Sequence, residues 1–532
     1  MFVQVLEPGG SGWLAAVIAL LPLALLLACL AGLRFSAWAA VLICAAVTVL
    51  LGVTVWDAPI GGTLTAYGLG SATGIWSVGW IVFWGLVIYN TMVTMGAFAA
   101  LRDWLVMAAG PDIRVQVLVL AWAFGALLEG LVGFGYPWAV VAPILIGLGM
   151  TDLAALRAAA LGNTAPVSNG ALGAPIIGLA AVTGLPLLEL SASIGKMVAV
   201  LAIVPPFLLI YLVSGREGLR TGWPLGVVAA AGFIAGQLPT SQFLGPYLPA
   251  VIGALTCLAC LLGLLRVWTP PPLSSGRPAW VDDLPTGNRR HELILAVQAG
   301  LVPIAILVAV VVAWTGPWSP LPRYVPFKLS VVAEGSLGTP VTIAFSWAPF
   351  VAGTATLTAW LLILAYLRPS RRQLARSFRA ALTQMWGALL VAPLIFGLAA
   401  VFNYAGMANT LASAFAGLGP GYLLLAPVLG WIAVAMSGSA TSSNTLFGAF
   451  QLSVGRLLGV PDVLCPALNS VGAAFGKPIA PQTASVGVAT TGQVRREGNI
   501  IRYNLAWTLA YLGYVMLAAA LFALFVPRST GL

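Results

Sequence analysis

Two charged side chains lie where the sequence is otherwise strongly apolar. Lys477 belongs to "FGKPIAPQ" (475–482) and Glu129 to "EGLVGFGYP" (129–137). An ionisable group inside a membrane segment costs on the order of a few kcal/mol and marks a functional site by default. Lys477 is too far from the end of its apolar run to reach an interface. We therefore predict that it binds an anion, with a carboxylate of a small ligand preferred over an ion pair with Glu129.

Glu129 is the only acidic residue in the apolar stretch 115–150. A low-dielectric environment disfavours the charged form of a carboxylate, as a proton carrier requires. We predict that Glu129 takes up and releases a proton. The alternative is an acid that caps the end of a helix.

Hydroxyl and amide side chains cluster in stretches that glycine and proline break, namely 129–137, "LGNTAPVSNGALGAPI" (161–176), "SGSATSSNT" (437–445) and "LNSVGAAFGKPIAPQT" (468–483). Irregular backbone at membrane depth is tolerated only where it is buried in protein or lines a watery cavity. Half-helix N-termini carry partial positive charge and free N–H groups, which suit a carboxylate. The alternative is close packing of small residues between helices. The predicted ligand-binding residues are Lys477, Asn163, Thr164, Ser168, Asn169, Tyr136, Ser437, Ser439, Thr441, Ser442, Ser443, Asn444, Asn469 and Gln482.

The composition requires a membrane environment for these segments. Of the 532 residues 60% are hydrophobic and only 7% are charged, whereas about a quarter are charged in soluble domains. The apolar runs are too long for the strands of a β-barrel, so we predict an all-α integral membrane protein. The net charge of +10 is attributed to cytoplasmic loops rather than to nucleic acid. Examples of these runs are 13–33, 36–55, 193–214, 293–315, 380–403 and 501–525.

The distribution of basic residues predicts the topology. With the N-terminus outside and re-entrant hairpins at 115–150 and 421–458, eighteen of the 24 Lys and Arg lie inside and five outside. Lys477 lies within a membrane segment. This asymmetry follows the positive-inside rule. It predicts about twelve crossings, two re-entrant hairpins and both termini outside.

Each predicted hairpin precedes a broken helix, 157–184 in the first case and 463–492 in the second. Because the hairpins enter from opposite sides, we predict an inverted repeat, an arrangement typical of secondary transporters. Chance similarity between glycine-rich and serine-rich segments is the alternative. The predicted regions are 1–113 (scaffold helices), 114–215 (first repeat), 216–420 (scaffold helices with cytoplasmic loops 267–292 and 368–379) and 421–532 (second repeat and last helix).

The sequence offers little for metal or acid–base chemistry. Cys257 and Cys260 are spaced like a metal-binding pair but have no second pair, and the single histidine is His291. We predict no metal and no cofactor. Since catalysis needs acid–base or nucleophilic groups, a membrane-embedded enzyme is disfavoured.

Four stretches together resemble the lactate permease family, bacterial inner-membrane carriers of lactate, glycolate and related 2-hydroxy acids with protons. They are "EGLVGFGYPWAVVAPILIGLG", "NTAPVSNGALGAPIIGLAAVTGL", "SGSATSSNTLFGAFQ" and "FGKPIAPQTASVGVATTGQVRREGNIIRYNL", and "GIWSVGWIVFWGLVIYN" (74–90) fits as well. The resemblance covers nearly the whole chain. It implies proton-coupled symport of a short monocarboxylate by an inverted-repeat carrier, in which elevator-like movement is common.

The chain departs from the family pattern at three positions. Tyr136 stands where a threonine is usual, and Ser168 and Asn169 replace less polar residues. These departures bear on which substrate fits rather than on its class. The expected partners are a small carboxylate, a proton and the lipid bilayer, without nucleic acid, and a homodimer is left open.

Two other transport functions stay open at this point. "SSNTLFG" (442–448) also resembles the hairpin tips of sodium-dependent dicarboxylate carriers, which would couple transport to sodium. A channel would show conductance instead of accumulation.

Overall fold

The computed structural model describes residues 2–33, 35–133, 135–273, 293–493 and 496–525. Most of the predicted loop 267–292 therefore lies outside the described residues. The first half of the chain contains β1 (Phe2–Val3), η1 (Pro8–Gly10), α1 (Gly12–Leu27), η2 (Ala28–Gly32), α2 (Ala37–Thr54), α3 (Ile60–Thr73), η3 (Gly74–Gly79), α4 (Trp80–Thr94), α5 (Ala97–Ala109), α6 (Ile113–Val117), η4 (Leu118–Phe124), α7 (Gly125–Leu131), α8 (Tyr136–Gly147), α9 (Asp152–Gly162), η5 (Ala165–Asn169), α10 (Gly170–Thr183), α11 (Leu187–Leu201), α12 (Val204–Phe243) and α13 (Pro249–Val267).

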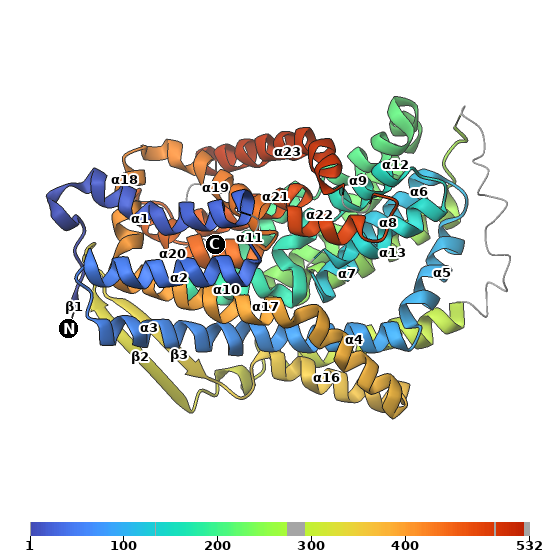
Figure 1. Cartoon of the computed structure of the whole chain (residues 1–532). Coiled ribbons are helices and arrows are strands. Elements are labelled where there is room, and N and C mark those ends of the chain that lie inside the picture. Colours follow the sequence, from blue (N-terminus) through green and yellow to red (C-terminus); the bar gives the residue numbers. More distant parts are fainter. Residues whose placement is uncertain (1, 34, 134, 274–292, 494–495, 526–532) are drawn as a thin grey trace.

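The second half continues the helical bundle, in which most helices run along one long axis (Figure 1). It contains η7 (Ala296–Leu301), α15 (Val302–Thr315), η8 (Leu321–Arg323), β2 (Phe327–Glu334), β3 (Val341–Trp347), α16 (Ala352–Leu367), α17 (Arg371–Ala405), α18 (Met407–Ala416), η9 (Gly419–Gly421), α19 (Tyr422–Ser437), α20 (Ala440–Leu457), α21 (Leu464–Gly476), η10 (Lys477–Ile479), α22 (Pro481–Val488) and α23 (Glu497–Phe525).

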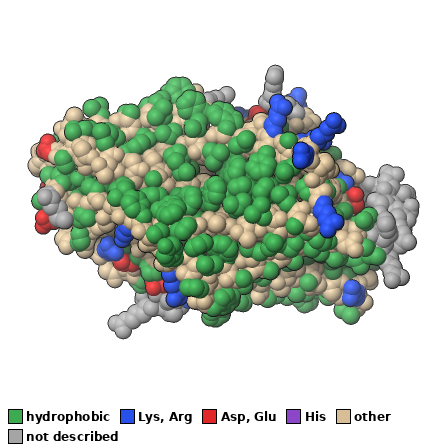
Figure 2. All heavy atoms as spheres, turned by 90° about the horizontal axis from the view of Figure 1, so that it is seen from below, with side chains coloured by type: hydrophobic (Ala, Val, Ile, Leu, Met, Phe, Trp, Pro, Cys, Tyr) green, Lys and Arg blue, Asp and Glu red, His purple; other side chains and the backbone are tan. Residues whose placement is uncertain are grey.

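The surface and the helix lengths fit a membrane protein. Within the described residues, eleven helical segments are long and apolar enough to cross a bilayer. Figure 2 shows hydrophobic side chains over the middle of one face, with most Lys and Arg side chains toward its ends. The prediction of a helical, multi-pass membrane protein is confirmed. The re-entrant nature of the hairpins and the orientation of the termini stay predictions.

Two helices begin earlier than the sequence prediction places them. The predicted loop 368–379 is wrong from residue 371 on, because α17 begins there. A capping box explains the early start, since Ser370 accepts from the Gln373 N–H and the Gln373 side chain accepts from the Ser370 N–H. The helix predicted at 77–99 begins earlier and is continuous over Ile60–Thr94.

A small sheet was not anticipated by the all-α prediction. Strand β2 pairs antiparallel with β3, and β1 pairs parallel with β2 through Phe2 and Val3. The sheet lies at the same end of the molecule as the N-terminus (Figure 1). Residues 345–347, which we assigned to the start of a helix, belong to β3. Apolar and polar residues alternate over 327–330 and two valines follow, a pattern that favours a strand there.

Glycines let α19 and α21 approach closely. A Cβ added to Gly472 would lie 2.0 Å from the Pro427 carbonyl oxygen, and one added to Gly476 would lie 2.4 Å from that of Trp431. Gly430 meets the Asn469 carbonyl in the same way. Small residues at helix contacts are a common packing device in membranes. The close contact fixes α21, and with it Lys477, against the neighbouring helix.

A fully buried arginine ties α6 to α12. The Arg114 guanidinium pairs with Asp112, donates to Thr221 Oγ1 at 2.6 Å and donates to the Pro271 carbonyl at 2.7 Å. The topology prediction places Arg114 among the eighteen basic residues on the inside. Its burial is tolerated because its donors are satisfied by a carboxylate and two oxygens.

The two predicted repeat units share an order of elements. In each, two helices separated by a glycine-containing turn precede a helix, a 3-10 turn and another helix: α7, α8, α9, η5 and α10 in the first unit, and α19, α20, α21, η10 and α22 in the second. This common order supports the repeat. That the units are inverted stays a prediction.

Candidate functional site

The two charges singled out in the sequence form a buried ion pair. Lys477 Nζ donates to Glu129 Oε1 at 2.5 Å, and the two residues are 4% and 2% exposed. Asn163 Nδ2 donates to the other carboxylate oxygen, Glu129 Oε2, at 2.9 Å. The contact that we ranked second for Lys477, an ion pair with Glu129, is therefore the one that the structure shows. Binding of a ligand carboxylate by Lys477 stays a prediction.

Broken helix ends hold this pair in place. Lys477 opens η10 directly after α21, and Asn163 caps the C-terminus of α9. Gly170 lies so close to the carboxylate that an added Cβ would be 2.5 Å from Glu129 Oε1. Glycine and proline interrupt both helices here, so that side chains and backbone of three segments converge on one carboxylate.

The backbone beside the pair is strained. Ala171 and Leu172 have φ values of 46° and 53°, and Gly173 follows at 80°. Left-handed backbone costs on the order of 1 kcal/mol for a residue with a Cβ. Such strain persists only where the surroundings determine the conformation, and it clusters at functional sites.

A chain of buried amides lies next to these broken helices. Asn444 Nδ2 donates to Ser470 Oγ at 2.9 Å, while Asn444 Oδ1 accepts from Asn469 Nδ2 at 3.1 Å. Asn469 Oδ1 accepts in turn from Gln451 Nε2, and Tyr422 Oη donates to Gln451 Oε1 at 2.7 Å. These side chains are already partnered with one another. They position α20 against α21 and are not free to bind a ligand.

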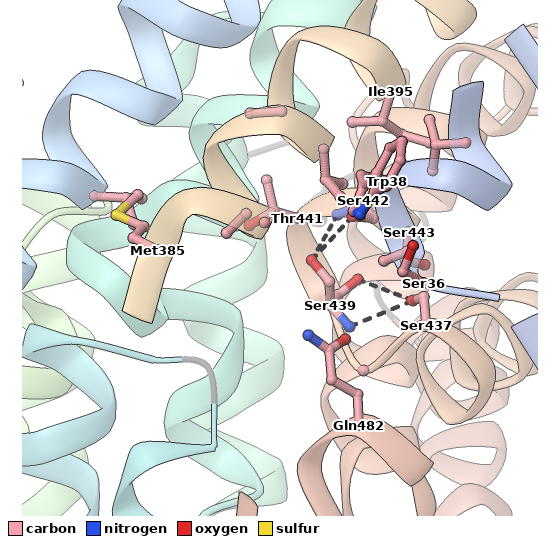
Figure 3. A pocket seen from close by; sticks show the side chains of 18 of the residues that line it. Ser36, Trp38, Met385, Ile395, Ser437, Ser439, Thr441, Ser442, Ser443 and Gln482 are labelled. Carbon is pink, nitrogen blue, oxygen red and sulfur yellow. Dashed lines mark hydrogen bonds between the residues drawn. The ribbon is translucent and has the colours of Figure 1, made fainter. Parts of the chain in front are cut away.

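The serine-rich tip between α19 and α20 is more open. Ser439 caps α20, because its Oγ accepts from the Ser442 N–H at 3.1 Å and from Ser442 Oγ at 3.0 Å. Ser437 Oγ donates to the Ala433 carbonyl, and Gly438 between them is left-handed at φ 71°. Figure 3 shows these hydroxyls and the Gln482 side chain gathered in one region.

The tip forms part of a pocket of about 410 Å³. Scaffold helices α1, α2, α4 and α17 supply its other walls, including Trp38 and Met385 (Figure 3). Clefts of about 300–1,000 Å³ are typical of small-molecule sites. The predicted ligand-binding residues that line it are Tyr136, Ser437, Ser439, Thr441, Ser442, Ser443 and Gln482.

Three helix N-termini meet at this pocket. The helices α8, α20 and α22 begin at Tyr136, Ala440 and Pro481, and residues of each first turn line the pocket. No side chain caps α8 or α22. At α8 the Tyr136 and Trp138 N–H groups donate to the Gly133 and Gly135 carbonyls, and Pro137 has no N–H. The first turns of α20 and α22 therefore supply the N–H groups and partial positive charge that favour an anion.

The structure thus divides the predicted residues into two groups. The first group is the seven residues that line the pocket. The second group does not line it and belongs to the ion pair, the amide chain or other buried hydrogen bonds: Lys477, Glu129, Asn163, Thr164, Ser168, Asn169, Asn444 and Asn469. Ser168 donates to the Ser470 carbonyl at 3.3 Å, and Thr164 donates to the Leu161 carbonyl at 2.8 Å. A single continuous site of all fifteen predicted residues is not what the structure shows.

The two groups are nevertheless adjacent. Thr483 lines the pocket, and a Cβ added to Gly135 would lie 2.9 Å from its Cγ2. Gly133, two residues away, would place a Cβ 3.7 Å from Glu129 Oε1. The turn between α7 and α8 therefore separates the ion pair from the pocket by only a few residues.

Sequence reasoning missed Gln451, Ser470 and the scaffold side of the pocket. Gln451 lies seven residues after Asn444, which places both on one face of α20, and that spacing was the available signal. The scaffold side chains, such as Trp38 and Met385, are apolar residues on long apolar helices. Nothing in their local sequence distinguishes them from lipid-facing neighbours.

Comparisons with known proteins identify the family of the chain. The glycolate permease GlcA and the L-lactate permease of Escherichia coli (strain K12) are each 31% identical to the chain over 545 residues, covering 97% and 96% of it and 96% of each relative. A solved structure of the Alcanivorax borkumensis YdaH transporter is similar with a TM-score of 0.47, 18% identity and coverage of 96% of this chain and 99% of that one. The family model for L-lactate permease matches residues 15–526. The chain therefore belongs to the L-lactate permease family.

Proposed function

We propose that the chain is a secondary active transporter that carries a short 2-hydroxy monocarboxylate, of the lactate or glycolate type, together with a proton. The names of the two E. coli relatives support the substrate class. The observation that carries the coupling is the buried pair of Lys477 and Glu129 beside an anion-favouring pocket. The bacterial inner membrane is the proposed location, with both termini outside.

The ion pair supplies a physical reason for coupling. Without substrate, Lys477 and Glu129 neutralise each other in a site that excludes water. A proton on Glu129 would leave the ammonium group uncompensated, and a substrate carboxylate would restore the balance. An anion that entered without a proton would leave one buried negative charge in excess. An uncompensated buried charge costs about 3–5 kcal/mol, and 3 kcal/mol corresponds to about 150-fold in affinity.

The pocket supplies the rest of the anion site. The N–H groups at the start of α20 and α22 stabilise the carboxylate, and Ser439, Thr441 and Gln482 offer hydrogen bonds to a 2-hydroxyl group. Lys477 lies five residues before Gln482 on the same broken helix. Alternating access then follows if the core that bears α20 and α22 moves against the scaffold helices, with the site exposed to one side at a time.

Uptake into proteoliposomes tests the proposal. Purified protein should accumulate labelled L-lactate when an inward proton gradient is imposed, and collapse of the gradient with an ionophore should end accumulation. Glu129→Gln should lose accumulation but keep lactate exchange, because the amide cannot carry the proton. The matched control is Glu189→Gln, an exposed acid in the first turn of α11, which should behave like the wild type.

Other outcomes would count against specific parts. An unchanged accumulation ratio in the Glu129→Gln variant would remove that residue's role. Accumulation driven by an inward sodium gradient at constant pH would replace proton coupling with the sodium alternative. Conductance without accumulation would indicate a channel.

A further inference from the structure

The pocket has one polar end and one long apolar side. The polar end consists of the hydroxyl and amide groups at the tip of α19 and α20 and at Gln482. Ser36 and Gln384 also line the pocket, and the Gln384 side chain accepts from Asn90 Nδ2. Figure 3 shows Trp38 and Ile395 on the side of Ser442, and Met385 on the side of Thr441. No lining residue in the described part of the chain is charged. We call the apolar side the scaffold wall, which consists of Leu26, Leu30, Trp38, Val82, Met385 and Val391.

The volume of the pocket exceeds what lactate or glycolate requires. An acid of that size fills on the order of 100 Å³, if each heavy atom is packed about as densely as protein interiors are. The pocket measures about 410 Å³. Lactate at the polar end would leave the scaffold wall against water, which is unfavourable for apolar surface.

We propose that the preferred substrates are 2-hydroxy monocarboxylates with a larger apolar side chain, branched or aromatic, rather than lactate itself. This proposal rests on the proposed function and specifies its substrate. The carboxylate and hydroxyl bind at the polar end, and the side chain lies along the scaffold wall, where it displaces water. Trp38 and the half-buried Tyr136 provide aromatic contacts for such a side chain.

A lipid acyl chain is a less suitable occupant. It would cover the scaffold wall but would leave the hydroxyls of Ser439, Thr441 and Ser442 and the helix N-termini without a ligand. A hydroxy acid satisfies both ends at once. The N-termini of α20 and α22 favour a negative charge at the end where its carboxylate would lie.

Competition in a counterflow assay tests the preference. Proteoliposomes loaded with unlabelled lactate take up labelled lactate without an imposed gradient, which avoids the collapse of a proton gradient by apolar acids that cross the bilayer. The competitors are lactate, 2-hydroxybutyrate, 2-hydroxy-4-methylpentanoate and 3-phenyllactate. The half-inhibitory concentration should fall about fourfold for each added carbon that becomes buried. Vesicles loaded with 3-phenyllactate should also drive lactate uptake, which shows that it is carried.

Two variants locate the effect. Ala388 lines the pocket from α17, whereas Leu390 on the same helix is 44% exposed. Ala388→Phe should lower the preference for 3-phenyllactate over lactate at least tenfold, and Leu390→Phe should leave it unchanged. If Ala388→Phe is inactive, Val391→Ala provides the reverse test. The smaller side chain enlarges the pocket beside the scaffold wall and should raise the preference for 3-phenyllactate over lactate.

The outcomes distinguish a failure of this substrate preference from a failure of the proposed transport function. If lactate exchanges but inhibition is equal along the series or weakens with size, the larger-substrate proposal is wrong and the transport function stands. If inhibition strengthens with size but neither pocket variant changes it, the apolar side chain binds elsewhere and the scaffold wall has no such role. If lactate does not exchange at all, the proposed function itself fails.

Discussion

The buried ion pair predicts a strong non-additivity between two substitutions. Lys477→Met leaves the Glu129 carboxylate with a single donor, Asn163 Nδ2, and Glu129→Gln leaves the Lys477 ammonium group without an opposite charge. Removing one partner of a buried pair costs about 3–5 kcal/mol, because the other charge stays buried. The double variant carries neither charge. We therefore expect it to recover most of the lost stability, so that the coupling free energy is about 3 kcal/mol or more.

Thermal unfolding in detergent measures this cycle, with the folded fraction followed by size-exclusion chromatography after heating. Both single variants should unfold at clearly lower temperature than the wild type, and the double variant should unfold close to it.

A surface ion pair supplies the control for the cycle. Arg456 and Asp462 lie 2.7 Å apart, but their side chains are 45% and 40% exposed. The corresponding cycle of Arg456→Met and Asp462→Asn should give a coupling of about 1 kcal/mol or less, because water screens the pair. If the two cycles give equal, small couplings, Lys477 and Glu129 do not form a desolvated pair, and the charge argument for proton coupling falls with it.

Two further predictions concern the elements that hold the site. Gly173→Ala should strongly destabilise the protein in thermal unfolding, since the added Cβ would lie 2.5 Å from the Pro246 carbonyl oxygen. The control is Gly184→Ala, because Gly184 has a similar positive φ but no atom within 4 Å of the added Cβ, and it should cost only about 1 kcal/mol. Asn469→Leu should cost about 2 kcal/mol, because the buried Asn444 Oδ1 loses its donor and Gln451 Nε2 loses one of its two acceptors. This loss should appear as reduced thermal stability.

Much of the fold was predictable because the membrane imposes simple rules. The lengths of the apolar runs predicted a helical membrane protein, and clustered Gly and Pro predicted the breaks before Tyr136 and around Lys477. The strand Phe327–Glu334 was missed because the stretch between two long apolar runs was assigned to an outer loop. The extension of α17 to Arg371 was missed because charge was taken to indicate a loop.

The sequence drew attention to polar residues in and around the candidate site, but it did not predict their contacts. Glu129 and Lys477 are 348 residues apart, so their pairing is a property of tertiary structure. Local sequence also does not distinguish Ser442, whose side chain lines a pocket, from Asn444, whose amide is engaged by Ser470 and Asn469. Both lie in one polar run, and only the direction in which each faces from α20 separates them.

Because the ion pair lies outside the pocket lining, Lys477 would act on a bound substrate through the backbone rather than by direct contact. Lys477 does not line the pocket, but it begins the 3-10 turn from which α22 continues to Gln482 and Thr483. The state of the ion pair and the shape of the polar end are therefore linked through one short, proline-broken segment. Release of Lys477 by a proton on Glu129 would act on the same backbone that presents N–H groups to the anion. If transport is coupled to protons as proposed, proton and substrate would influence each other across a few residues, because both would bias the position of α22.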